Sequence, residues 1–219
     1  MEVRLQLNAY GKSWLALCGL LALGSVLGWL VPAPWFDWQP SLASSQPWRW
    51  WTAAFVHWSE THLLANMLGL VVVAVLGRVA QVPAVVALAW LVSWPLLHLA
   101  LLMQPALAHY GGLSGVLHAG VAVVATFVAA TRTVAARGVA LAMLVGLVVK
   151  VVSETPWGGP LQQVQGWDIA VAPLAHASGL VLGVLMTLLV LARDGFANHQ
   201  GLGKTSTTSN QLDQNKGLR

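Results

Sequence analysis

The sequence predicts an all-α membrane protein with six membrane-spanning helices. Of its 219 residues, 57% are apolar and only 8% are Asp, Glu, Lys or Arg, whereas soluble domains average about 45–50% and about 25%. So few charged side chains cannot cover the surface of a soluble fold of this length. The composition excludes an ordinary cytosolic enzyme, a disordered chain and a nucleic-acid-binding domain. The pI near 9.7 reflects only 11 basic against 7 acidic residues and indicates no basic patch.

Six apolar segments carry this prediction, since a spanning helix needs about 20 residues, with a range of about 17–25. The second and fifth segments are short, at 15 and 14 residues, so we expect them to extend into flanking small residues or to cross a thin part of the bilayer. The segments are Trp14–Val31, His62–Leu76, Val82–Met103, Leu113–Ala130, Val139–Val152 and Ile169–Ala192.

The basic residues predict the topology, because Lys and Arg are concentrated in cytoplasmic loops. Six spans leave both termini on one side of the membrane. With both termini in the cytoplasm, only Arg49 and Lys150 fall outside. We therefore predict an N-in, C-in topology with nine cytoplasmic basic residues, which are Arg4, Lys12, Arg78, Arg132, Arg137, Arg193, Lys204, Lys216 and Arg219.

The first span is interpreted as an uncleaved helix rather than a secretory signal. Its apolar run is longer than a typical signal core, and Pro32 and Pro34 make a poor cleavage site. Cys18, the only cysteine, lies in this span, so the chain has no intramolecular disulfide and no Cys-rich metal site.

Two segments outside the spans differ in composition from the rest. Residues 32–51 hold five Trp and four Pro, which predicts a loop without a long helix that lies in the outer membrane interface. Residues 1–13 are predicted to form a cytoplasmic N-terminus, and the polar residues 194–219 a disordered cytoplasmic tail. No internal repeat is visible, which disfavours an inverted-repeat transporter.

Polar side chains within the spans are costly and therefore indicate candidate sites. His62 and Asn66 are four residues apart, so they share a helix face at the outer start of the second span, shortly after Arg49 and His57. Both side chains are hydrogen-bond donors. Packing between helices remains the alternative explanation of this pair.

Ser114 lies at the outer end of the fourth span, between Gly112 and Gly115, and His118 follows one turn later. The glycines allow close backbone approach, and backbone N–H groups at a helix N-terminus have no intrahelical partner. They also carry the positive end of the helix dipole, which would stabilise an oxyanion. By itself this motif is weak, because the chain has 21 glycines.

His176 is placed about two turns into the sixth span from the outer side, with Gly179 and Gly183 on the same face. Small residues on that face let a neighbouring helix come close. A histidine bonded to a backbone carbonyl is the alternative. The topology brings these polar groups to a similar depth, which predicts one outward-facing pocket with the parts of an acyl-transfer site.

These motifs resemble those of the rhomboid intramembrane serine proteases, in the same order and on the second, fourth and sixth helices. The resemblance covers about residues 45–190 and predicts a rhomboid-like six-helix bundle over 14–193. The run Leu113–His118 and the compact form resemble the bacterial rhombosortase branch, which is associated with substrates bearing a C-terminal Gly-Gly, a transmembrane helix and a basic tail. The matching residues are Trp48, Arg49, His57, His62, Asn66, Gly112, Leu113, Ser114, Gly115, His176, Gly179 and Gly183.

The resemblance implies that Ser114 is the nucleophile and His176 the general base. It implies an oxyanion hole of His62, Asn66 and the Ser114 backbone N–H. His118 lies where many rhomboids have a Tyr, and is the alternative base. The other supporting residues are Gly112, Gly115, Gly179, Gly183, His57 and Arg49.

The resemblance also implies no cofactor, no metal and no third, acidic member of the site. Nothing in the sequence positions Glu60, Glu154 or Asp168 on His176. The expected partners are transmembrane protein substrates and membrane lipid, with no nucleic acid. The expected location is the bacterial inner membrane, with the site open to the periplasm.

Two other functions remain open from the sequence. One is a catalytically inactive rhomboid-like protein that binds membrane clients, although such proteins usually lose the Ser or the His. The other is a metal-ion transporter using His57, His62, His118 and His176, since zinc accepts histidine ligands.

Overall fold

The computed structural model describes residues 11–193 and contains six helices long and apolar enough to cross a membrane. The prediction of an all-α, six-helix fold is confirmed. The helices are α2 Lys12–Trp29, α4 Glu60–Val79, α5 Ala84–Ala100, α6 Ser114–Thr131, α7 Val134–Ser153 and an unlabelled final helix, Pro173–Arg193.

The two spans that are short in the sequence are 20 residues long in the structure, α4 and α7. The N-terminus of α4 extends two residues beyond the predicted start because Ser59 caps it. The Ser59 hydroxyl accepts a hydrogen bond from the His62 backbone N–H at 3.1 Å, which satisfies a donor without an intrahelical partner.

The final helix begins at Pro173, four residues later than predicted. The preceding residues form a two-stranded antiparallel hairpin of β1 (Gln162–Gln163) and β2 (Ala170–Val171). Proline suits the first turn of a helix, because its missing N–H would have no partner there. The predicted start at Ile169 is therefore wrong.

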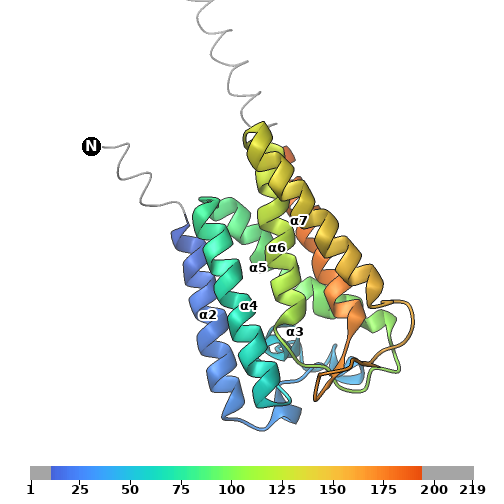
Figure 1. Cartoon of the computed structure of the whole chain (residues 1–219). Coiled ribbons are helices and arrows are strands. Elements are labelled where there is room, and N and C mark those ends of the chain that lie inside the picture. Colours follow the sequence, from blue (N-terminus) through green and yellow to red (C-terminus); the bar gives the residue numbers. More distant parts are fainter. Residues whose placement is uncertain (1–10, 194–219) are drawn as a thin grey trace, which may run out of the picture.

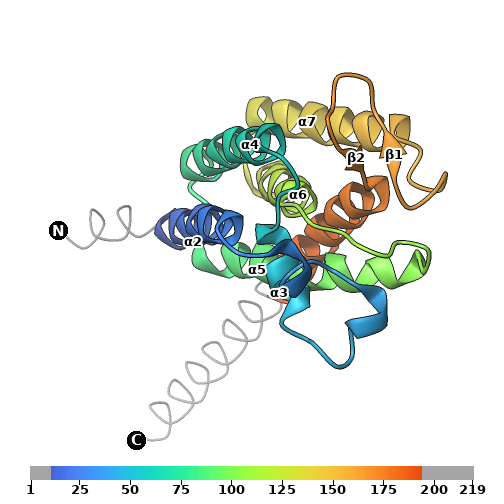
Figure 2. The ribbon, with the colours of Figure 1, turned by 90° about the horizontal axis from the view of Figure 1, so that it is seen from below.

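Helix α6 lies between α4, α5 and α7 (Figure 2) and is the most buried of the labelled helices. Stacked indole rings of Trp14 and Trp90, with centroids 4.2 Å apart, lie in the apolar core. The Trp14 indole N–H donates to the Val73 carbonyl at 2.9 Å, and that of Trp90 to the Val116 carbonyl at 2.8 Å. These bonds tie neighbouring helices together in the core.

The final helix packs against α6 along a seam of small residues. A Cβ added to Gly179 would lie 2.1 Å from the Gly115 carbonyl oxygen, and one added to Gly183 would lie 2.6 Å from that of Ala119. Real atoms do not approach so closely, so only glycine permits this contact. We call these four residues the glycine seam, and its close contacts agree with the small-residue face predicted around His176.

Helix α7 lies at the edge of the bundle (Figure 2). Of its 20 residues, only Ala140 and Val151 are buried. Gly138 and Gly146 have no atom within 4 Å of an added Cβ. Most of this helix therefore faces outward, and its packing differs from that of the glycine seam.

Short helical turns fill the proline-rich segment, as expected from its prolines, and continue just beyond it; they are η1 Ala33–Trp35, η2 Pro40–Leu42, α3 Arg49–Thr52 and η3 Ala53–Phe55. Buried Arg49 braces this segment through the Asp37 carboxylate at 2.9 Å and the Pro34 carbonyl at 2.9 Å. Its placement in the membrane interface stays a prediction.

The first ten residues and the predicted tail 194–219 lie outside the described residues.

The bundle has two distinct ends (Figure 1). At one, which we call the site end, α4, α6 and the final helix begin and α7 ends. Among the described basic residues, Arg49 and Lys150 belong to the site end, and five others belong to the opposite end, which are Lys12, Arg78, Arg132, Arg137 and Arg193. The separation agrees with the predicted charge pattern; which end faces the cytoplasm stays a prediction.

Candidate active site

Ser114 is the first residue of α6, as the sequence predicts. Gly112 precedes it with a φ of +142°, a conformation that favours glycine. The Gly112 N–H donates to the Ala53 carbonyl at 2.9 Å, which fixes the turn into the helix. The Ser114 hydroxyl therefore lies at a helix N-terminus, where free N–H groups and the helix dipole favour negative charge.

His176 meets Ser114 across the glycine seam. The Ser114 hydroxyl donates to His176 Nε2 at 2.8 Å. His176 lies in the first turn of the final helix rather than two turns in, because that helix begins at Pro173. A Cβ on Gly115 would lie 2.9 Å from the Ala175 carbonyl oxygen. Close backbone contact thus holds the serine and the histidine together.

The other ring nitrogen of His176 contacts a carboxylate. Nδ1 lies 2.7 Å from Glu154 Oε2, and Lys150 Nζ lies 2.8 Å from Glu154 Oε1. Burial raises the pKa of the Glu154 carboxyl, but the hydrogen bonds and charges of His176 and Lys150 outweigh burial and lower it to about 2. The interpretation that no carboxylate is positioned on His176 is therefore wrong.

This contact was missed because Glu154 and His176 are 22 residues apart and the intervening hairpin turns the chain back. Glu154 directly follows α7, so it shares a helix face with Lys150, four residues earlier. A Lys and a Glu at this spacing, at the end of an apolar span, were the available signal.

His118 stacks on His176, with ring centroids 4.2 Å apart and planes 9° apart. Its Nδ1 lies 2.7 Å from the Ser114 backbone carbonyl and donates to it. Its Nε2 lies 2.7 Å from Lys150 Nζ and accepts from that ammonium. Because both nitrogens are engaged away from the Ser114 hydroxyl, this geometry favours His176 over His118 as the base.

His62 and Asn66 lie on one face of α4, as predicted. His62 Nδ1 accepts the Trp58 backbone N–H at 3.4 Å, so its proton is assigned to Nε2. A Cβ on Gly112 would lie 2.9 Å from His62 Nε2, which shows how closely that ring approaches the start of α6. The Asn66 Nδ2 atom is buried and has no partner among the described residues.

Of the predicted supporting residues, only His118 lines the cavity at this site; the four glycines, His57 and Arg49 do not. His57 lies behind His62, with ring centroids 4.9 Å apart, and its Nδ1 contacts the Phe55 carbonyl at 3.2 Å. Burial lowers the pKa of His57, and the hydrogen bond to the Phe55 carbonyl offsets this only in part, so that the pKa falls to about 4. Arg49 instead bonds residues of the proline-rich segment. Neither residue therefore contacts the cavity directly: His57 packs against His62, and Arg49 holds the proline-rich segment in place.

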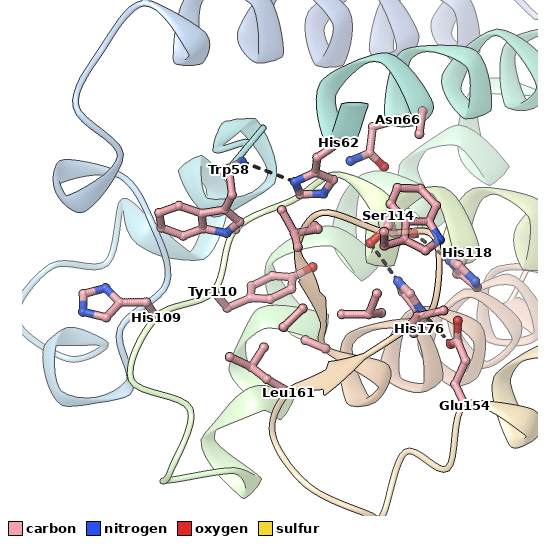
Figure 3. A pocket seen from close by; sticks show the side chains of 18 of the residues that line it. Trp58, His62, Asn66, His109, Tyr110, Ser114, His118, Glu154, Leu161 and His176 are labelled. Atoms are coloured by element: carbon pink, nitrogen blue, oxygen red, sulfur yellow. Dashed lines mark hydrogen bonds and ion pairs between the residues drawn. The ribbon is translucent and has the colours of Figure 1, made fainter. Parts of the chain in front are cut away.

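The side chains of His62, Asn66, Ser114 and His176 surround one cavity of about 710 Å³ (Figure 3). The four polar residues predicted to share one pocket line the same cavity, although most of its wall is apolar. Seven further lining residues belong to the β1–β2 hairpin or flank it, and are Leu161, Val164, Trp167, Ile169, Ala170, Val171 and Ala172.

The arrangement combines a hydroxyl, an imidazole positioned to accept its proton, and nearby N–H donors. These are the parts needed for nucleophilic attack on a carbonyl and for stabilising the resulting oxyanion. Within residues 11–193, no group of three or more His, Cys, Asp or Glu side chains is arranged to hold a metal ion.

Comparison with known families identifies a Rhomboid domain over residues 44–193. The comparison with curated proteins found no match to the chain. The family match covers more than half of the chain and includes every residue that lines the cavity except Pro34, whose side of the cavity lies in the proline-rich segment. Members of this family are generally intramembrane serine proteases that act on transmembrane substrates. The chain belongs to the rhomboid family.

Proposed function

We propose that this protein is an intramembrane serine endopeptidase with Ser114 as nucleophile and His176 as general base. The 2.8 Å contact between the Ser114 hydroxyl and His176 Nε2, inside the cavity, carries the proposal. This distance is within the range for direct proton transfer. The close helix contact at the glycine seam keeps the two groups together without substrate.

In the first half-reaction, His176 Nε2 takes the Ser114 proton as the serine oxygen attacks the substrate carbonyl carbon. The N–H groups of His62 Nε2, Asn66 Nδ2 and the Ser114 backbone stabilise the oxyanion. The imidazolium then gives its proton to the leaving amine, the peptide bond breaks, and an acyl-enzyme remains. Water, deprotonated by His176, hydrolyses the ester and restores Ser114.

This mechanism requires neutral His176, because a protonated Nε2 cannot accept the serine proton. Hydrolysis should therefore fall as the pH is lowered toward the acid limit of folded protein. Initial rates across that range, with folding followed in parallel, measure the effect. A rate that stays flat down to that limit would contradict the role of His176 as base.

A fluorophosphonate probe tests the reaction class, since it labels activated serines. We expect labelling of the wild type and none of Ser114→Ala, with both proteins equally folded. An unlabelled wild type would instead support the inactive, client-binding alternative. An unlabelled protein with zinc-dependent transport would support the histidine transporter.

The proposed substrates are single-span membrane proteins with a C-terminal Gly-Gly, a transmembrane helix and a basic tail. Resemblance to the rhombosortase branch supports this choice. In vesicles, the wild type should cleave such a substrate at least tenfold faster than a matched Val-Val version. Equal cleavage of the two would contradict the Gly-Gly preference.

The proposed location is the bacterial inner membrane, with N-in, C-in topology and cleavage near the periplasmic surface. The separation of basic residues between the two ends of the bundle supports this orientation. Alkaline phosphatase folds to an active enzyme only in the periplasm. A fusion after Arg193 should be inactive, and an active fusion would contradict the orientation.

A further inference from the structure

The serine–histidine mechanism leaves Glu154 and Lys150 without a role, although both reach the catalytic imidazole. We propose that Glu154 is a positioning residue that completes a Ser114–His176–Glu154 relay, and that Lys150 holds its carboxylate in place. This proposal deepens the proposed function and rests on it. Figure 3 shows Glu154 beside His176, away from Ser114.

The first argument concerns the proton on the imidazole. A neutral imidazole carries one N–H. Since His176 Nε2 must accept the Ser114 proton, Nδ1 must carry the hydrogen before the reaction. Nδ1 therefore needs an acceptor, which Glu154 Oε2 provides at 2.7 Å. The Lys150 ammonium, 3.2 Å from Nδ1, cannot serve because it has no lone pair.

The second argument concerns charge. When His176 takes the serine proton it becomes an imidazolium, and the ionised Glu154 lies in direct contact with it. The His176 side chain is only 7% exposed and that of Glu154 18%, so water screens this pair weakly. The carboxylate stabilises the charge that develops in the transition state, as the third member of a serine protease triad does.

The third argument concerns how the carboxylate is held. Lys150 Nζ bonds Glu154 Oε1 at 2.8 Å and His118 Nε2 at 2.7 Å. His118 in turn donates to the Ser114 backbone carbonyl at 2.7 Å. The contacts form a closed ring from the Ser114 hydroxyl through His176, Glu154, Lys150 and His118 back to Ser114. Every donor in this ring faces an acceptor.

The Glu154→Gln substitution tests the relay sharply because glutamine has only one side-chain oxygen. Lys150 attracts that oxygen, which turns the amide NH₂ toward His176 Nδ1. The imidazole must then carry its hydrogen on Nε2, where it cannot accept the serine proton. We expect kcat to fall by up to about 10⁴-fold, the loss that follows when the acid of a serine protease triad is replaced by its amide, with KM nearly unchanged.

A second substitution separates positioning from structural support. In Lys150→Met/Glu154→Gln, nothing competes for the amide oxygen, so it can turn toward His176 Nδ1 and accept its hydrogen. We expect the double variant to recover at least tenfold in kcat over Glu154→Gln alone. A merely structural role predicts that the double variant is as slow or slower, which would overturn the proposal.

Controls distinguish failure of this proposal from failure of the proposed function. Glu60→Gln makes the same change at an exposed site-end glutamate and should retain wild-type kcat. Glu154→Asp keeps the charge and should be faster than Glu154→Gln. If Ser114→Ala is inactive while Glu154→Gln stays within twofold of wild type, the relay is wrong and the dyad stands. An active Ser114→Ala overturns both.

Discussion

Two helices determine the surroundings of His176, and they do so in different ways. The final helix carries His176 itself and meets α6 backbone to backbone at Gly179 and Gly115. Helix α7 and its end reach the imidazole only through the long side chains of Lys150 and Glu154. The Lys150 side chain is 44% exposed.

The glycine seam therefore sets where Ser114 and His176 lie, whereas the side chains from α7 and its end adjust the protonation and charge of His176. At the glycine seam, one added methyl group would move a helix, so the serine–histidine distance depends on the backbone. At α7, side chains can adjust while the helices stay in place. We therefore expect changes in the seam to disturb helix packing and activity together, and changes in the side chains of α7 and its end to alter activity while the helices stay in place.

Among changes in helix packing, the largest effect is expected for Gly179→Ala. Its Cβ would lie 2.1 Å from the Gly115 carbonyl oxygen, so the two helices must separate and the Ser114–His176 contact must lengthen. Overpacking costs about 1–3 kcal/mol, occasionally more. We expect at least a 100-fold loss of cleavage and a lower unfolding temperature in detergent.

The matched control is Gly146→Ala on α7, where an added Cβ meets no atom within 4 Å. Alanine stabilises helix interiors by about 0.5–1 kcal/mol relative to glycine. Activity should be unchanged and stability equal or slightly higher. If both substitutions behave alike, the contrast between the seam and α7 is wrong.

The next effect concerns α4, which supplies the proposed oxyanion donors His62 and Asn66 and does not contact His176 through the seam or through Glu154. Asn66→Ala removes a buried Nδ2 that has no partner among the described residues. We expect kcat to fall about 10²–10³-fold, as for loss of one oxyanion donor, with little change in unfolding temperature. If stability falls while turnover of the folded protein is kept, Asn66 serves helix packing instead.

A smaller effect is expected for His118→Phe. Phenylalanine keeps a flat ring stacked on His176 but loses the bonds to the Ser114 carbonyl and Lys150. Because His118 supports the ring and is not the base, kcat should fall less than about tenfold, which corresponds to about 1.4 kcal/mol. Abolished cleavage by folded protein would make His118 the better candidate for the base.

The smallest effect concerns stability at acid pH. The pKa of Glu154 is lowered from its ordinary value of 4.5 to about 2, so its ionised contacts stabilise the fold above pH 4.5 and are lost as the pH falls toward 2. The gap in unfolding temperature between wild type and Glu154→Gln should shrink over that range. Partly exposed ion pairs contribute about 1 kcal/mol or less, and a constant gap would contradict this contribution.

The sequence predicted the spans and the seam well because both follow from local patterns. Apolar runs identify membrane helices, and His176, Gly179 and Gly183 share a face by helical periodicity. The predicted depth of His176 was wrong because the hairpin before Pro173 is too short and irregular to recognise. The Glu154 contact depends on that same hairpin; the Lys150–Glu154 spacing is visible in the sequence, but it does not show which residue the carboxylate contacts.

The most direct test of the central claim compares Ser114→Ala, His176→Ala and the double variant in vesicles with a cleavable transmembrane substrate. Substitutions at residues that act as one unit have non-additive effects on the rate. Each single substitution should therefore lower the cleavage rate as much as both together. We expect all three variants to show the same residual rate, at least 10³-fold below wild type. A single variant that keeps more than a tenth of wild-type cleavage would contradict the Ser114–His176 assignment.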